Sequence, residues 1–150
     1  MQISTKGRYG LHALVDLALH GSGQPETIKN IAERCRLPEE YILQIFVVLR
    51  RAGIVKSVRG SRGGYILAKA PSEITVGDVL TSLEGPLAPT ACILGKKEHS
   101  CSRYEKCVTR ILWEKIKTGI YEVINSITIA DLVKSCNSIP ASKTGLEYYI

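Results

Sequence analysis

Three cysteines lie near one another in the second half of the 150-residue chain: Cys92, Cys101 and Cys107. Thiolates are soft ligands that suit iron–sulfur clusters or zinc. The spacing C-x8-C-x5-C lacks the C-x2-C pairs of common zinc sites, so it predicts one metal centre without naming the metal. Clusters normally take four protein ligands. His99 is the candidate fourth ligand, although a single histidine in a loop is more often solvent-exposed.

The other reactive side chains do not form a recognisable catalytic set. We expect Cys35 to be a small buried residue on the inner face of a helix, and Cys136 to be structural. A disulfide among the loop cysteines is the weaker alternative, relevant after oxidation. No nucleophile–base or acid–base arrangement has a suitable context, so the sequence does not favour an enzyme.

The cysteines lie in and after a long irregular segment. Residues 84–100 show no regular pattern, and a loop of that length is more often functional than not. From Arg103 to Asn125 a long helical pattern follows. Its near-heptad apolar stripe needs a partner, and a homodimer is favoured over packing on the same chain. The stripe comprises Val108, Ile111, Leu112, Ile116, Ile120, Val123, Ile124 and Ile127.

The net charge of +6 comes entirely from one half of the chain. Residues 1–70 contain eleven Lys and Arg against five Asp and Glu, whereas residues 71–150 contain nine of each. This split favours an anionic polymer as the partner of the first half, with a solvated basic surface as the alternative. The polar start and the lack of a long apolar run predict a cytoplasmic protein that does not enter a membrane.

Residues 11–53 have the pattern of a helix–turn–helix. Apolar residues at helical spacing run from Leu11 to Leu19, and Thr27 is placed to cap a second helix. A short link with Pro38 at an N1-like position leads into a third helix with one apolar face, which ends at Gly53. Residues 54–58 and 65–67 are β-prone, and the RGSRGG between them predicts a hairpin with a basic tip, the shape of a wing.

A third helix placed in the major groove would present Gln44 to adenine, with Tyr41 and Arg51 near phosphates. Arg59 and Arg62 at the wing tip suit an A/T-rich minor groove. Ser4 and Lys6, expected just before the first helix, are candidates for phosphate contact. The complete predicted DNA-binding set is Ser4, Lys6, Tyr9, Glu40, Tyr41, Gln44, Arg51, Arg59, Gly60, Ser61 and Arg62.

The segments STKGRYG, YILQIF and VRGSRGGYIL, together with the three loop cysteines, resemble the IscR family of winged-helix regulators, which includes NsrR and CymR. The resemblance implies a homodimer held by the long helix, a pseudo-palindromic operator on double-stranded DNA and a [2Fe-2S] cluster on the three cysteines. It also implies that Tyr41, Gln44 and Arg59 contact DNA.

The chain departs from that family pattern at several positions. The first two cysteines are further apart than in the best-known IscR form, and Arg110 replaces a histidine expected three residues after the last. Arg8 stands where NsrR-like members have an acidic ligand, and Leu43 stands where IscR has a glutamate that tunes operator choice. The LEGPL segment and the EYYI tail are more like CymR, whose tail resembles a peptide that docks into cysteine synthase.

The sequence thus predicts a mostly α fold with a small β-wing: a winged helix–turn–helix domain plus a long dimerisation helix. We expect the DNA-binding domain at 1–83, the cluster loop at 84–102, the dimerisation helix at 103–127, and a short helix and tail at 128–150. The predicted function is a cluster-responsive repressor of cluster-biogenesis genes. The alternatives are a CymR-type repressor of sulfur metabolism controlled by cysteine synthase, or a nitric-oxide or redox sensor.

Overall fold

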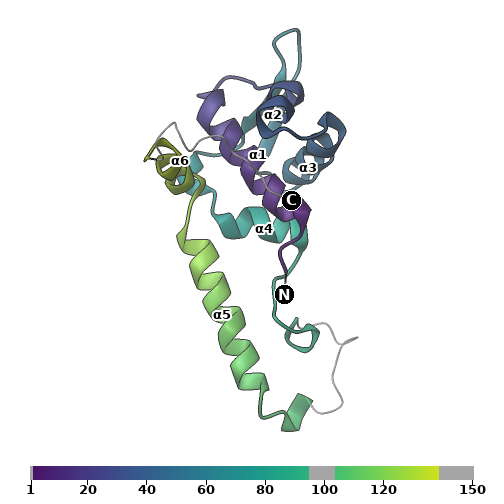
Figure 1. Ribbon diagram of the computed structural model, residues 1–150, viewed down its shortest axis with the longest axis vertical. Helices are drawn as coiled ribbons and strands as arrows, with labels where there is room; N and C mark the ends of the chain where they lie inside the picture. Colours follow the sequence, from purple (N-terminus) through teal and green to yellow (C-terminus); the bar gives the residue numbers. More distant parts are fainter. Residues whose placement is uncertain (1, 95–103, 139–150) are drawn as a thin grey trace.

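The computed structural model describes residues 2–94 and 104–138 as a helical body from which one long helix extends (Figure 1). The α-helices are α1 (Thr5–Gly21), α2 (Ile28–Cys35), α3 (Glu39–Arg51), α4 (Val76–Glu84), α5 (Arg110–Ser126) and α6 (Ile129–Ser138). The strands are β1 (Val55–Val58) and β2 (Gly64–Leu67), and 3-10 turns occur at Pro71–Glu73, Ala91–Ile93 and Tyr104–Lys106. The predicted mostly α architecture with one small sheet is confirmed.

The first helices begin where side chains cap them. Ser4 accepts a hydrogen bond from the Gly7 amide at 3.2 Å, so α1 begins at Thr5, and Lys6 lies inside its first turn rather than before it. Thr27 caps α2 as predicted, accepting from the Asn30 amide at 3.2 Å. Pro38 is the N-cap of α3 rather than its first helical residue, because its ψ of 137° is extended.

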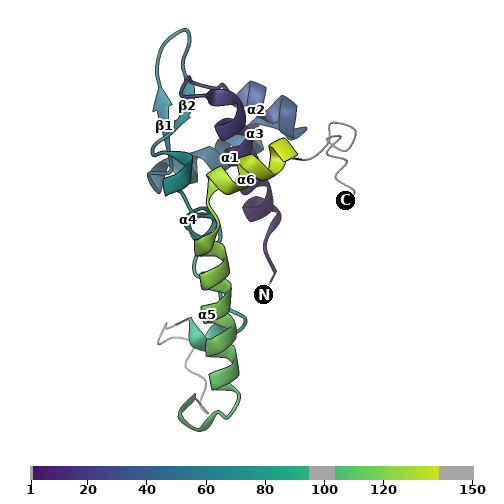
Figure 2. The ribbon, with the colours of Figure 1, turned by 90° about the vertical axis from the view of Figure 1, so that its left-hand side faces the viewer.

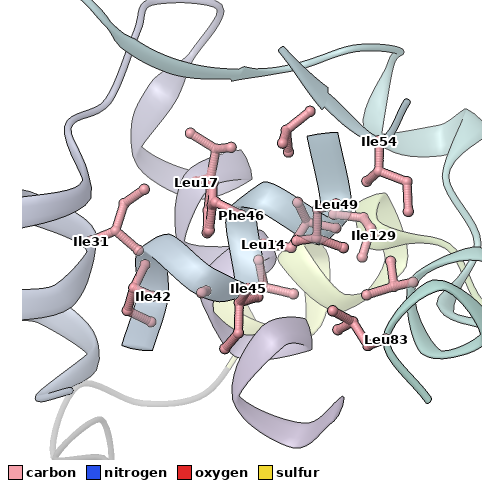
Figure 3. Packing of buried hydrophobic residues seen from close by; sticks show 14 of the residues in the cluster. Leu14, Leu17, Ile31, Ile42, Ile45, Phe46, Leu49, Ile54, Leu83 and Ile129 are labelled. Atoms are coloured by element: carbon pink, nitrogen blue, oxygen red, sulfur yellow. The ribbon is translucent and has the colours of Figure 1, made fainter. Parts of the chain in front are cut away.

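One hydrophobic core joins α1, α2 and α3 to the start of the hairpin and to α6 (Figure 3). Phe46 and Leu49 of α3 are fully buried against α1, and Ile129 of α6 lies in the same cluster. Burying an aliphatic or aromatic side chain contributes about 1.5–3 kcal/mol, so this cluster fixes how α3 is presented. The last helix is therefore part of the core of the body.

The hairpin forms the predicted wing, with strand ends within one residue of the expected ones. Strands β1 and β2 pair antiparallel, with Val55 opposite Leu67 and Val58 opposite Gly64. The hairpin and α5 project from opposite ends of the body (Figure 2). None of the helices in the described ranges is long and apolar enough to cross a membrane.

Helices α4 and α6 each begin at a threonine cap. Thr75 and Asp78 exchange side-chain-to-backbone hydrogen bonds, both 3.0 Å long. The corresponding pair at α6 is Thr128 and Asp131. Cys136 lies inside α6.

The long helix is shorter than predicted at its start. It begins at Arg110, not Arg103, because the Arg110 amide bonds to the Cys107 carbonyl at 3.2 Å and closes a separate turn. The helical hydrogen bonds of α5 begin after this turn, where the Leu112 and Trp113 amides donate to the Thr109 carbonyl. Cys107 therefore precedes α5, whose 17 residues span about 25 Å.

Candidate nucleic-acid interface

Helix α3 has one face in the core and one face free for a ligand. Ile42, Ile45, Phe46 and Leu49 are buried. On the opposite face Glu40, Gln44 and Arg51 are exposed, as the sequence predicted. Leu43 lies among these polar groups with 44 % of its surface exposed. An exposed leucine there adds an apolar surface of the kind that contacts thymine methyl groups.

The structure brings the start of α1 against the start of α3. The rings of Tyr9 and Tyr41 meet edge to face with centroids 6.2 Å apart, and the Arg8 guanidinium lies 5.6 Å from the Tyr9 ring centre. Burial, reinforced by the nearby Tyr9 and Glu84, raises the pKa of the Tyr41 phenol. The phenol is therefore neutral at physiological pH and keeps an O–H that a phosphate oxygen could accept.

Ser4 closes this corner of the molecule. Besides capping α1, its hydroxyl donates to the Glu84 carboxylate at the end of α4, at 2.5 Å. Sequence reasoning missed Arg8 and Glu84 as members of the surface. The KGRYG run could have pointed to Arg8, which shares a turn with Tyr9. Glu84 is 80 positions from Ser4, and no local pattern signals that contact.

The basic wing tip is separate from this corner and is joined to α3 through its base. Arg59, Ser61 and Arg62 are exposed at the tip. Gly60 has a φ of 113°, which favours glycine, and its carbonyl accepts from the Gly63 amide at 2.9 Å. The tip thus carries two guanidinium groups on a narrow turn, a shape suited to the minor groove.

Two of the three predicted metal-ligating cysteines lie in the described residues. Cys92 lies in the 3-10 turn Ala91–Ile93, and Cys107 lies three residues before α5. Both are free thiols with intermediate exposure. Hydrogen bonds from the Thr109 side chain and backbone lower the pKa of the Cys107 thiol, which favours the thiolate that a metal needs. Cys101 and His99 lie outside the described residues.

The segment that carries Cys92 is fastened to α5 at two points. The Leu87 amide donates to the Tyr121 hydroxyl at 3.0 Å, and Lys117 donates to the Ile93 carbonyl at 3.1 Å. Chemically, accessible thiols fit an iron–sulfur cluster. Within residues 2–94 and 104–138, however, no three His, Cys, Asp or Glu side chains gather at one point. A complete site would need Cys101 in addition to Cys92 and Cys107.

The remaining cysteines pack against the core. Cys35 and Cys136 are partly buried against the main cluster. Burial raises the pKa of Cys35 to about 11, with the Asp16 charge acting in the same direction. A thiol held protonated is a poor metal ligand and a poor nucleophile. This agrees with the prediction of a packing role for Cys35.

The family model of Rrf2, described as an iron-dependent transcriptional regulator, matches residues 3–135. The chain belongs to the Rrf2 family. It is 39 % identical over 147 residues to Protein rrf2 of Nitratidesulfovibrio vulgaris, covering 98 % of this chain and 97 % of that protein. It is 43 % identical over 133 residues to the transcriptional regulator CymR of Bacillus subtilis, covering 88 % and 89 %. The solved structure of T. potens IscR matches with a TM-score of 0.73 and 43 % identity, covering 99 % and 97 %.

These relatives establish the broad function of this Rrf2-family member. It is a transcriptional regulator, not an enzyme, and its winged-helix fold is that of the solved IscR structure. DNA is accordingly a ligand of this regulator. The relatives bear the names of Rrf2, CymR and IscR proteins.

Proposed function

We propose that this Rrf2-family regulator is a homodimeric repressor that binds a pseudo-palindromic operator and responds to a [2Fe-2S] cluster, controlling genes of cluster biogenesis. One observation carries the link between cluster and DNA. Glu84, the last residue of α4, bonds to Ser4 of the DNA-facing corner, and Cys92 lies eight residues after Glu84 in the chain. A change of ligation at Cys92 would thus act close to the interface.

The proposed DNA contacts divide by type. Gln44 reads a base in the major groove, whereas Ser4, Lys6, Tyr9, Tyr41 and Arg51 hold phosphates. Glu40 borders the base-reading surface of α3. The wing residues Arg59, Gly60, Ser61 and Arg62 enter the minor groove. These eleven residues form the proposed surface of the DNA-binding domain, residues 1–83.

This assignment predicts the effect of removing one wing guanidinium. Arg59→Ala should weaken binding to the operator by about 1–3 kcal/mol at physiological salt. Lys134→Ala, which removes an exposed cation from α6, is the matched control and should leave the affinity nearly unchanged. Equal affinities of Arg59→Ala and wild type would contradict the wing contact.

The proposed dimer buries the exposed apolar stripe of α5. Ile111, Leu112 and Val123 are each more than half exposed, and an exposed row of this kind marks an interface. We assign residues 103–127 to dimerisation and residues 84–102 to the cluster loop, with the short helix and tail at 128–150. A DNA-binding regulator of this kind acts in the cytoplasm.

Cluster binding is tested by anaerobic reconstitution of the full chain with iron and sulfide. The expected result is a brown protein with visible absorbance and about one cluster per subunit. Cys92→Ala should lose the absorbance, and Cys35→Ala, whose thiol is half-buried, should keep it. A colourless wild-type protein without iron would overturn the cluster assignment. His99→Ala tests the proposed fourth ligand in the same assay.

The similarity to CymR supports a second candidate, a repressor of cysteine metabolism controlled by cysteine synthase. The sequence feature that supports this candidate is the C-terminal segment EYYI. Deletion of residues 147–150 should abolish binding to cysteine synthase in a pull-down with purified proteins. Unchanged capture by the truncated chain would remove this candidate. A nitric-oxide or redox sensor is the third candidate, and loss of cluster absorbance on addition of nitric oxide would support it.

A further inference from the structure

Arg34, in the last turn of α2, holds two acidic residues from outside its own helix. Its Nε lies 3.0 Å from each carboxylate oxygen of Asp16 on α1. Its Nη2 lies 2.8 Å from Asp16 and 2.9 Å from Glu26 in the α1–α2 connection. The side chains of Asp16, Glu26 and Arg34 are only 13 %, 18 % and 30 % exposed. This network is better shielded from water than a surface ion pair, and Arg34 donates to Asp16 through two guanidinium nitrogens.

Glu26 connects this network to the wing. Its backbone forms an isolated bridge with Tyr65 of β2. The Glu26 amide donates to the Tyr65 carbonyl at 3.0 Å, and the Tyr65 amide donates to the Glu26 carbonyl at 2.8 Å. A Cβ at Gly64 would overlap the Glu26 carbonyl, so a glycine is needed for this close approach. Glu26, which Arg34 binds, is therefore paired with the second strand of the wing.

The Tyr65 side chain packs the wing base against α3. The Tyr65 ring meets the fully buried Phe46 ring edge to face, with centroids 5.1 Å apart. Gly64 is next to Tyr65 and pairs with Val58 at the last step before the tip. The wing base is thus held at Tyr65 by two contacts, its ring against α3 and its backbone against the Glu26 backbone.

A two-stranded hairpin is marginally stable alone, so the direction of this wing depends on what holds its base. We propose that Arg34 and Glu26 are positioning residues for the wing: their ion pair fixes the strand-like Glu26 segment, which sets the angle between the hairpin and α3. Neither residue belongs to the proposed DNA-contacting set. They act through Tyr65, and the inference rests on the proposed DNA contacts of Arg59 and Gln44.

The test measures the wing contact in the minor groove separately from the recognition-helix contact in the major groove. A duplex is first selected from a random-sequence pool by the full-length wild-type protein. The cost of Arg59→Ala (wing) and of Gln44→Ala (recognition helix) in affinity for that duplex is then measured in four backgrounds: wild type, Arg34→Gln, Glu26→Gln and Glu33→Gln. Glu33→Gln is the matched control, because it removes a carboxylate from an exposed site on α2.

In wild type and Glu33→Gln we expect Arg59→Ala to weaken binding about tenfold. In Arg34→Gln and Glu26→Gln the same change should cost about twofold or less, because the wing no longer meets its groove. The cost of Gln44→Ala should stay the same in all four backgrounds. A merely stabilising role for the network would reduce the folded fraction and leave the cost of Arg59→Ala unchanged.

Two variants and a rescue keep the test informative. Glu26→Gln keeps the size of the side chain, so it serves if Arg34→Gln fails to fold. Arg34→Lys retains the positive charge but lacks the second nitrogen that bonds the carboxylate. In this background Arg59→Ala should again weaken DNA binding, in part. An undiminished cost in both glutamine variants overturns this inference and leaves the proposed DNA contacts intact. A wild-type protein that is insensitive to Arg59→Ala overturns both.

Discussion

The hydroxyl of Ser4 donates a hydrogen bond to the carboxylate of Glu84, which ties the first residue before α1 to the last residue of α4. Ser4 also accepts from the Gly7 amide, so the Glu84 carboxylate lies at the positive end of the α1 dipole. The corner that presents Tyr9 and Tyr41 is therefore built on an acidic residue from the segment leading to Cys92. This contact makes Glu84 the residue to change first.

Glu84→Ala should lower the free energy of unfolding by about 1–2 kcal/mol. The hydrogen bond contributes about 1 kcal/mol, and the charge at the helix N-terminus adds about 0.3–1 kcal/mol. Glu122→Ala, which removes an exposed carboxylate from α5, is the control and should change stability by less than about 0.5 kcal/mol. Urea denaturation followed by circular dichroism measures both. Equal stabilities of the two variants would contradict a structural role for the Ser4 contact.

Gly10→Ala should destabilise the protein even though alanine favours helices. A Cβ at Gly10 would overlap the Leu83 side chain of α4 and press on Ile45 of α3. Overpacking a core costs about 1–3 kcal/mol, against a helix-propensity gain of about 1 kcal/mol. We expect a net loss near 1 kcal/mol in the same denaturation assay. A stabilised variant would mean that α4 can move away from α1 at little cost.

Leu112→Asp should convert the dimer into monomers, because it places a charge within the exposed apolar stripe of α5. Glu114→Lys reverses an exposed charge on the same helix, about 160° around from Leu112, and is the control. Sedimentation velocity over a range of protein concentrations measures the shift. Dimers that persist in Leu112→Asp would place the interface elsewhere.

Cys35 should resist alkylation by iodoacetamide in the folded protein at pH 8. Burial raises the pKa of its thiol to about 11, so only about one thiol in a thousand is ionised at that pH. Peptide mass spectrometry gives the labelling rate, and the same reaction in denaturant is the reference. A folded rate equal to the denatured one would refute the protection.

The raised pKa of the Cys35 thiol also makes the stability of the folded protein depend on pH. The unfolded Cys35 thiol ionises near pH 9, before the folded one, so the folded state binds more protons between these values. Stability from this group is present below about pH 9 and declines as the pH rises through about 11.

Local patterns were enough to predict the main elements of the body. The caps at Thr27, Thr75 and Thr128 and the apolar face of α3 each involve residues within a few positions of one another, so the sequence encodes them directly. The wing followed from β-prone runs around a glycine-rich tip. The start of α5 was wrong, because apolar periodicity does not report where the turn at Cys107 ends.

By itself, the sequence determined the helix–turn–helix, the basic wing and the cysteine spacing, since each depends on residue types at short separations. Only the tertiary structure decided that Glu84 lies against Ser4, that Tyr9 meets Tyr41 edge to face, and that α6 returns to the core. Those contacts arise from packing between elements far apart in the chain. Many arrangements of the same apolar faces can form a hydrophobic core. The particular arrangement that forms determines which polar side chains become neighbours.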